Sequence, residues 1–274
     1  MSEQVLIFSD LDGTLLDHDT YSHAPADALL ARLKKADIPV IPTTSKTYAE
    51  VIVLRQQLAL NGPYIIENGA AIYIPQDFFP SQPPRTQLID GYWVHQFTAP
   101  KQDWLALLAQ IAGQFNGLFE HFSSMSNERI SQTTGLSPAD AIRAAERQYG
   151  EPILWLGDER QKRRFIQALE ELGATPLQGG RFIHLSGDCD KGMALHWMVT
   201  QCKLQRPESD FISIALGDGG NDVAMLEAAD IAVRILSPAN TLPILSKTDK
   251  VYTSTLPGPA GWSECLSLIL TPHL

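Results

Sequence analysis

Short apolar segments alternate with helical ones at both ends of the chain, and this alternation restricts the fold more than any other feature. Strands are predicted at residues 5–8, 38–42, 64–66, 211–216 and 231–233. Helices are predicted at residues 26–35, 48–60, 191–202 and 222–228. Short buried strands separated by helices of this length favour a parallel sheet covered on both faces. The two ends of the chain are therefore expected to form one α/β core with a Rossmann-like parallel sheet.

A different pattern fills the middle of the chain. Prolines at 75, 80, 83 and 84 lie close together, and proline at this density indicates a hinge or a domain boundary. Beyond them, strands are predicted at residues 92–97, 153–156 and 182–185, and helices at residues 103–114, 138–149 and 159–172. Because the first pattern resumes after Asp188, this α+β segment is inserted into the core. We expect a core of residues 1–80 and 187–274 and an inserted cap domain of residues 81–186 that sets substrate specificity.

The charge of the chain restricts its partners. Lys and Arg number 21 against 31 Asp and Glu, which gives a formal net charge of -10. Such a chain repels nucleic acid and anionic lipid, so an anionic ligand must be held by a local site. The sequence shows no bilayer-length apolar run and no signal-peptide pattern, and its 3 cysteines are widely spaced. We expect a cytoplasmic enzyme with a small-molecule substrate and no nucleic-acid or membrane partner; its oligomeric state stays open.

Two carboxylates follow the first predicted strand. In an open α/β sheet, ligands bind beyond the carboxyl ends of the strands, and Asp10, Asp12 and Gly13 fall at such an end. Asp10 can attack a phosphoryl group as a nucleophile, while Asp12 can protonate the leaving oxygen and then deprotonate a water. Gly13 lets the chain turn sharply and brings backbone amides toward the phosphate. The alternative is an ordinary turn after a strand, where aspartate and glycine are common.

Hydroxyl-bearing residues follow the second predicted strand. Thr44 and Ser45 are both candidates to bond a phosphoryl oxygen beside the positive N-terminus of the next helix. Thr47 and Glu50 have the spacing of a capping box, so Thr47 is expected to begin that helix. Lys46 is either a substrate-binding residue or a solvated surface charge.

Two later segments complete the candidate site. Lys191 begins a helix after the inserted segment and can neutralise the charge on Asp10 and its phosphoryl adduct. A strand then ends in a glycine-rich loop that carries Asp218, Asn221 and Asp222. Carboxylates of this kind suit Mg²⁺, which removes the cost of gathering several of them in one place. The alternatives are a helix cap at Asp222 and an exposed lysine at 191.

In their order along the chain, these segments resemble the four motifs of phosphatases of the haloacid dehalogenase superfamily. The resemblance covers both outer stretches and rests on Asp10-Leu11-Asp12-Gly13-Thr14, Thr44, Lys191 and Gly217-Asp218-Gly219-Gly220-Asn221-Asp222. It implies hydrolysis through an aspartyl-phosphate, with the catalytic residues Asp10, Asp12, Thr44 and Lys191. It implies a metal site in which Asp10, Asp12 and Asp218 hold Mg²⁺ and Asp222 supports the site from behind these ligands or through a water. Asn221 would lie near the phosphoryl group.

Three shorter segments are similar to the mannosyl-3-phosphoglycerate phosphatase family. They are Ser45-Lys46-Thr47, Thr133-Thr134-Gly135-Leu136-Ser137 and Gly179-Gly180-Arg181-Phe182-Ile183-His184. This resemblance implies a mannosyl- or glucosyl-3-phosphoglycerate substrate, as in mannosylglycerate biosynthesis. Arg181 would then grip the glycerate carboxylate, and Thr133 and Thr134 would bind sugar hydroxyls.

The sequence leaves other functions and other roles open. A broad-specificity sugar-phosphate phosphatase and a phosphomutase of the same fold would share the core residues. A sensor that binds sugar phosphates without turnover is disfavoured, because the chain keeps all of the catalytic carboxylates and the lysine. For Arg181, a solvated position in a hairpin turn is the alternative to a binding role.

Overall fold

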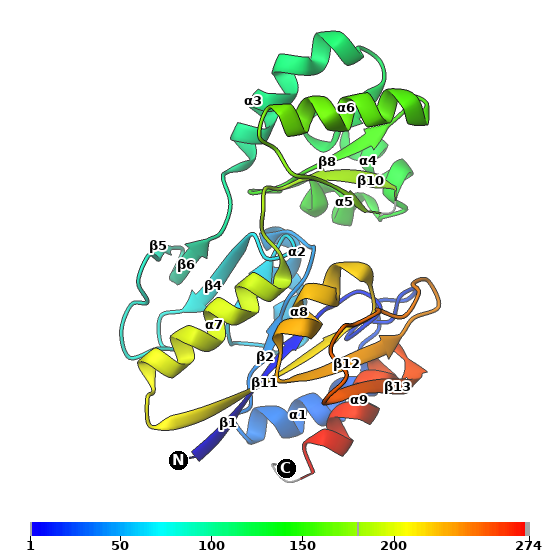
Figure 1. Ribbon diagram of the computed structural model, residues 1–274. Helices are drawn as coiled ribbons and strands as arrows, with labels where there is room; N and C mark the ends of the chain where they lie inside the picture. Colours follow the sequence, from blue (N-terminus) through cyan, green and yellow to red (C-terminus); the bar gives the residue numbers. More distant parts are fainter. Residues whose placement is uncertain (1, 180, 272–274) are drawn as a thin grey trace. The chain divides into compact units, whose positions relative to one another are not determined.

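The computed structural model describes residues 2–179 and 181–271. The chain folds into two compact units, both visible in Figure 1. The first unit takes in Met1–Ser45, Leu54–His95 and Asp190–Leu274. The second takes in Lys46–Val53 and Gln96–Cys189. None of the described helices is both long and apolar enough to cross a membrane.

A parallel sheet organises the first unit. Its strands are β1 (Ser2–Ser9), β2 (Val40–Pro42), β11 (Ser209–Gly217), β12 (Ile231–Leu236) and β13 (Val251–Pro257). They lie in the order β13-β12-β11-β1-β2, and every neighbouring pair is parallel. Strand β1 pairs with β11 along its whole length, from Ser2 opposite Ser209 to Ser9 opposite Leu216. This pairing confirms that the two ends of the chain build one α/β core.

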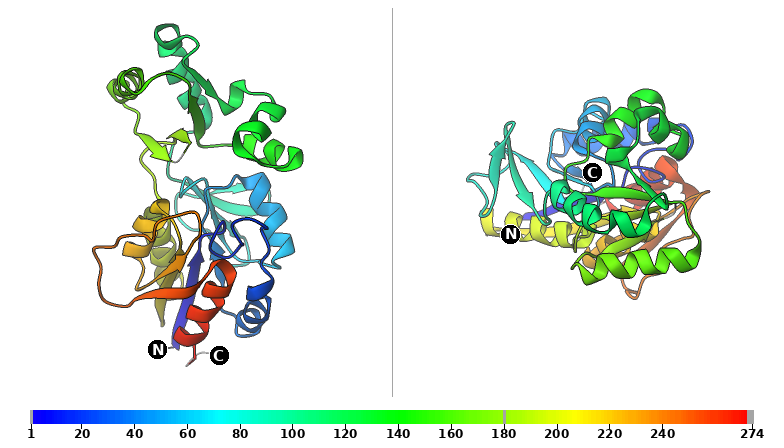
Figure 2. Two further views of the ribbon diagram at one scale, coloured as in Figure 1. Left: turned by 90° about the vertical axis from the view of Figure 1, so that its right-hand side faces the viewer. Right: turned by 90° about the horizontal axis from the view of Figure 1, so that it is seen from above.

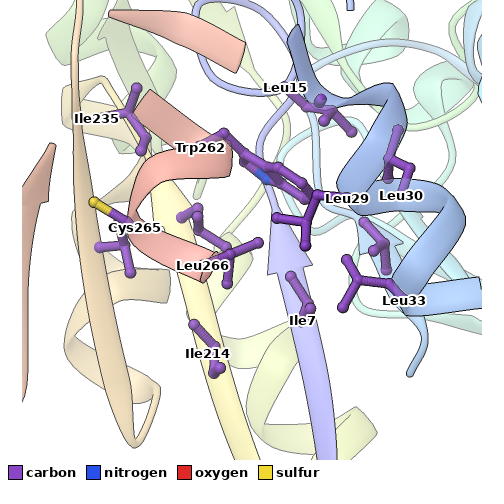
Figure 3. Close-up of a cluster of buried hydrophobic side chains, with 14 of the residues drawn as sticks. Ile7, Leu15, Leu29, Leu30, Leu33, Ile214, Ile235, Trp262, Cys265 and Leu266 are labelled. Atoms are coloured by element: carbon purple, nitrogen blue, oxygen red, sulfur yellow. The ribbon is translucent and has the colours of Figure 1, made fainter. Parts of the chain in front are cut away.

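Helices cover both faces of this sheet. Helices α1 (Asp27–Lys35) and α9 (Gly258–Ile269) lie on one face, and α7 (Lys191–Gln205) and α8 (Val223–Ala228) lie on the other (Figures 1 and 2). The alternation of β1 accounts for this arrangement, since Val5 and Ile7 point into the α1/α9 core. In Figure 3, Trp262 of α9 lies among side chains of α1 and of the central strands. Helix α2 (Tyr48–Gln57) follows β2, and a short 3-10 helix (Ala24–Ala26) precedes α1.

The expectation that residues 64–66 form a strand of the parallel sheet is wrong. Strand β3 (Tyr64–Ile66) belongs to a second sheet, with β4 (Ala71–Pro75), β5 (Gln87–Ile89) and β6 (Tyr92–Gln96), in the order β3-β4-β6-β5. It pairs antiparallel with β4 and meets the residue after β2 only through one bridge, Thr43 to Ile65. Stacked rings of Tyr64 and Tyr73, 5.1 Å apart, join these strands.

The proline-rich segment does not end the first unit, because the second sheet continues beyond it. Pro75 closes β4, and Pro80, Pro83 and Pro84 lie in the connection to β5. The first unit therefore runs on to His95, further than the expected limit at residue 80.

The second unit contains an antiparallel sheet in the order β7-β8-β10-β9. Its strands are β7 (Phe119–His121), β8 (Glu151–Trp155), β9 (Pro176–Gly179) and β10 (Phe182–Leu185). Its helices are α3 (Lys101–Ile111), α4 (Asn127–Thr134), α5 (Pro138–Ala145) and α6 (Glu159–Glu171), with 3-10 turns at Ala112–Phe115 and Phe122–Ser124. Residues of α3, α6 and the sheet form one apolar core. The expected helix 138–149 is shorter and ends at Ala145.

Candidate active site

Asp10 is held firmly at the carboxyl end of β1. Its backbone N–H donates to the carbonyl of Leu216 at 2.9 Å, which continues the pairing with β11. The Ser9 hydroxyl donates to the Asp10 carbonyl at 2.7 Å, and the indole Nε1 of Trp262 donates to the Ser9 hydroxyl at 3.0 Å. Asp10 itself is buried. Trp262, to which the sequence pattern assigns no function, therefore anchors the turn that carries Asp10.

Gly13 allows the β1 turn to approach the Asp218 carboxylate. Its φ is +77°, and a Cβ at this position would lie 2.5 Å from Asp218 Oδ2. Asp12, in the same turn, is half-buried. The hydroxyl of Thr14 donates to Asp218 Oδ1 at 3.3 Å. The turn after β1 and the turn after β11 therefore meet at one point, as the parallel sheet requires.

The loop after β11 is organised by Asp222. A 3-10 turn spans Gly220–Asp222, and Oδ2 of Asp222 accepts hydrogen bonds from the N–H groups of Asp218 at 3.0 Å and Gly219 at 2.9 Å. A Cβ on Gly217 would lie 2.4 Å from the Cβ of Asp222, so only glycine fits there. Asp222 is fully buried, and its carboxylate holds the backbone of the loop in place.

Lys191 joins these two loops. It is completely buried, and its Nζ donates to Asp10 Oδ1 and to Asp222 Oδ1, each at 2.6 Å. Asp190 is the N-cap of α7 and accepts from the Met193 N–H at 2.7 Å, which fixes the start of the helix that carries the lysine. The prediction of an interior charge-neutralising lysine fits this geometry, and an exposed lysine does not.

The electrostatics of the cluster favour an additional cation. Burial raises the pKa of the Asp10 carboxyl well above its ordinary value, and Asp222 and Asp12 raise it further, while Lys191 offsets only part of this. Burial alone would lower the pKa of Lys191, but the two carboxylates outweigh it and raise that pKa, so the lysine stays protonated. One ammonium group therefore does not compensate the carboxylates gathered here.

Three of the four residues predicted for the Mg²⁺ site lie close together. Asp10, Asp218 and Asp222 each present a carboxylate oxygen, and these oxygens lie within 4.8 Å of one another. Buried carboxylate oxygens are the ligands that Mg²⁺ prefers, so the residues present fit this cation. Asp12 is not part of this group of side chains within the described part of the chain.

Thr44 is buried beside the site, and its backbone fixes the loop after β2. Its N–H donates to the Ile65 carbonyl at 3.1 Å, and its carbonyl accepts from the Asn68 N–H at 2.8 Å. Ser45 is half-buried. The choice between the hydroxyls of Thr44 and Ser45 as the phosphate ligand stays a prediction.

The next residues differ in part from expectation. Lys46 is only 9% exposed, and its Nζ lies 3.7 Å from Glu50 Oε1, so it is not a solvated surface charge. The capping box is confirmed: the Thr47 N–H donates to Glu50 Oε2 at 2.8 Å, and the Glu50 N–H donates to the Thr47 hydroxyl at 3.2 Å.

A left-handed turn at residues 67–69, for which the sequence predicts no catalytic or binding role, packs against the site. Glu67, Asn68 and Gly69 have φ values of 48°, 60° and 96°. The side-chain amide of Asn221 donates to Asn68 Oδ1 at 3.2 Å, which connects the turn to the loop after β11. A Cβ on Gly69 would lie 2.1 Å from the Asp190 carbonyl oxygen, at the start of α7. The turn therefore packs directly against the residue that precedes Lys191.

We expect Gly69→Ala to lower both stability and activity. The left-handed backbone alone costs about 1–3 kcal/mol, and the clash with Asp190 displaces the start of α7 and with it Lys191. Gly91→Ala is the matched control, because Gly91 has φ +83° and nothing within 4 Å of its added Cβ. Urea unfolding and kcat are measured for both variants. Equal destabilisation of the two variants, with full kcat in Gly69→Ala, would contradict the packing role.

The predicted substrate-binding residues of the second unit have distinct environments. Thr133 is 9% exposed, and its hydroxyl donates to the Arg129 and Ile130 carbonyls at 2.9 and 3.0 Å. The Thr134 hydroxyl donates to the Ile130 carbonyl at 2.7 Å. Arg181 is exposed in the turn between β9 and β10, and its neighbour Gly180 lies outside the described residues. The binding roles of these three residues stay predictions.

Known proteins match this chain over most of its length. Residues 7–242 match the family of haloacid dehalogenase-like hydrolases. A relative from Methanococcoides burtonii is 35% identical over 262 residues, which span 95% of each chain; it is a glucosyl-3-phosphoglycerate/mannosyl-3-phosphoglycerate phosphatase.

Solved structures share the fold at low sequence identity. A haloacid dehalogenase-like hydrolase from Bacteroides thetaiotaomicron has a TM-score of 0.71 at 18% identity, covering 97% of this chain and 99% of that one. The sucrose-phosphatase of Synechocystis, solved with sucrose and phosphate, has a TM-score of 0.60 at 16% identity, with 98% of both chains covered. With its parallel α/β core, its inserted α+β unit and these matches, the chain belongs to the haloacid dehalogenase-like hydrolase family.

Proposed function

We propose that this protein is a Mg²⁺-dependent phosphatase that converts glucosyl- or mannosyl-3-phosphoglycerate into the glycosylglycerate and phosphate. One observation supports the reaction class above all others. The Lys191 ammonium donates to the carboxylates of Asp10 and Asp222, each at 2.6 Å, and the Asp218 carboxylate lies beside them. The support for the substrate is the 35% identical relative of that activity, which matches over 95% of both chains.

The first step is transfer of the phosphoryl group to Asp10. A carboxylate oxygen of Asp10 forms a bond to phosphorus while the bond from phosphorus to the glycerate oxygen breaks. Asp12 donates its proton to that departing oxygen. The Lys191 ammonium holds Asp10 in position and balances the negative charge of the adduct. Thr44 or Ser45 and the amide of Asn221 bind phosphoryl oxygens.

The second step is hydrolysis of the aspartyl-phosphate. Asp12, now ionised, takes a proton from water, and the water oxygen attacks phosphorus and releases phosphate and the Asp10 carboxylate. Asp10 and Asp218 would hold the Mg²⁺, and Asp222 would support the loop behind them. The Asp12 carboxyl, which is not part of this group of carboxylates in the described part of the chain, would carry the proton. The cation supplies positive charge that keeps Asp10 ionised and shields the incoming phosphate.

The second unit acts as the cap in this proposal. Arg181 grips the glycerate carboxylate, and Lys46, Thr133 and Thr134 take part in binding the substrate. The exposed position of Arg181 in a hairpin turn leaves its guanidinium accessible to a ligand. A cytoplasmic location belongs to the same proposal and is supported by three buried cysteines, all within the described residues, that form no disulfide bond.

Phosphate release in the presence and absence of a chelator tests the reaction class. Activity should fall to background when divalent cations are removed and return when Mg²⁺ is restored, because the carboxylate cluster lacks its counter-charge without the cation. Chelator saturated beforehand with Mg²⁺ is the control. Turnover that persists without metal would contradict the site. Transfer of the phosphoryl group between sugar positions, with no free phosphate released, would identify a phosphomutase instead.

A further inference from the structure

The connection between β12 and β13 forms no helix or strand, yet it is held at several points. The guanidinium of Arg234, a residue of β12, donates to the Pro243 carbonyl at 3.4 Å and to the Thr253 hydroxyl at 2.7 Å. The first bond attaches the middle of the connection to β12, and the second joins β12 to β13. We call residues 237–250 the β12–β13 connection.

The far end of the connection is attached to the end of α8. The Lys247 ammonium donates to the Ala229 carbonyl and, at 3.1 Å, to the Asp230 carbonyl. The carboxylate of Glu227 accepts from the N–H groups of Ser246 and, at 3.1 Å, Lys247. A surface segment held by this many hydrogen bonds has a well-defined backbone conformation.

Asn240 extends from this connection to the active site. Its side-chain Nδ2 donates to Asp218 Oδ2 at 2.8 Å, while Thr14 donates to Asp218 Oδ1 at 3.3 Å. Each carboxylate oxygen thus accepts a hydrogen bond from a described residue and offers a further lone pair. Asp218 is 2% exposed, so its carboxylate has little freedom beyond these contacts.

We propose that Asn240 is a positioning residue that sets the orientation of the Asp218 carboxylate for the divalent cation. The proposal rests on the cation site of the proposed function. Partners that orient a ligating carboxylate affect metal affinity strongly, although they do not touch the metal. Asn240 also carries no charge, so it fixes the carboxylate without competing with the cation for it.

The experiment compares Asn240→Ala with wild type and with Thr241→Ala, a change at the exposed neighbouring residue. Mg²⁺ binding is measured calorimetrically without substrate, and kcat and KM are measured at saturating Mg²⁺. Asn240→Ala is expected to bind Mg²⁺ about 10- to 100-fold more weakly. Its KM for substrate and its unfolding midpoint should stay close to wild type, because Asn240 is exposed and does not belong to the core. Thr241→Ala should match wild type throughout.

The two proposals fail in different ways in this experiment. If wild type binds Mg²⁺ and Asn240→Ala binds it equally well, the positioning role is overturned and the phosphatase assignment stands. If wild type itself binds no Mg²⁺, the cation site fails and the positioning role with it. A lowered unfolding midpoint with unchanged Mg²⁺ affinity would mean that Asn240 serves the connection alone, which also overturns the proposal.

Discussion

Asp10→Asn is expected to lower kcat by about 10⁴-fold or more, the scale seen when a nucleophile is removed from a site that otherwise stays intact. The substitution keeps the size of the side chain and removes the attacking oxygen's charge. Lys191 keeps its second partner, Asp222, at 2.6 Å, so the arrangement of the loops should survive. Phosphate release at saturating Mg²⁺ measures the effect, and thermal unfolding shows whether the fold is intact.

Asp37→Asn is the matched control for this variant. Asp37 is exposed and has φ 54°, a backbone conformation that asparagine also adopts readily. Its kcat should equal that of wild type. If Asp10→Asn keeps a substantial fraction of wild-type kcat, and the activity follows the variant through successive purification steps, Asp10 is not the nucleophile.

Lys191→Met is expected to have the largest effect on stability. Removing one partner of a buried charge cluster costs about 3–5 kcal/mol, because Asp10 and Asp222 are left without compensation. Activity should be lost as well, since the ammonium that holds the nucleophile is absent. Urea unfolding of the variant and wild type measures the difference. Lys203→Met, at an exposed position on the same helix, should stay within about 0.5 kcal/mol of wild type.

The pH dependence of this loss has a defined sign. The pKa of the folded-state Asp10 carboxyl lies well above its ordinary value because of burial, and removing Lys191 removes the main influence that lowers this pKa, so the variant takes up a proton at Asp10 on folding. The destabilisation of Lys191→Met should therefore be largest at pH 8 and should shrink as the pH falls and Asp10 becomes protonated. Added Mg²⁺ should reduce it too. A cost that is independent of both pH and Mg²⁺ would show that packing, rather than charge, is the main role of Lys191.

The core site was predictable because parallel strands bring their carboxyl ends together. Asp10 and Asp218 each follow an apolar strand, and the pairing of β1 with β11 places the two turns side by side. Lys191 was recognisable only through its place in the order of the motifs. Its burial depends on α7 packing closely against α8, where a Cβ on Gly192 would lie 2.4 Å from the Ala224 carbonyl oxygen.

Other parts of the fold left weaker signals in the sequence. Strand β13 lies at the sheet edge and exposes Tyr252 and Leu256, so it has no apolar run to mark it. Asn240 sits in an irregular connection, and its reach to Asp218 depends on anchors at Arg234 and Lys247 that no local pattern reveals. These contacts join residues that are far apart in the sequence, and local periodicity therefore does not predict them.

The sequence does carry a local signal for the environment of Thr133 and Thr134. Ser126 caps the start of α4 by accepting from the Arg129 N–H, and Gly135 with φ 83° ends the helix. Serine before a helix and glycine after it are the usual boundary residues. They place Thr133 and Thr134 in the last turn of a helix, which accounts for the backbone bonds of their hydroxyls.

Substrate choice tests the central claim most directly. The values of kcat/KM for phosphate release with Mg²⁺ should be compared among glucosyl-3-phosphoglycerate, mannosyl-3-phosphoglycerate and simple hexose phosphates. The proposed function predicts that at least one glycosyl-3-phosphoglycerate exceeds every hexose phosphate by orders of magnitude, and that Arg181→Ala reduces this preference mainly through KM. Equal turnover of all these compounds would contradict the assigned substrate and would identify a sugar-phosphate phosphatase of broad specificity.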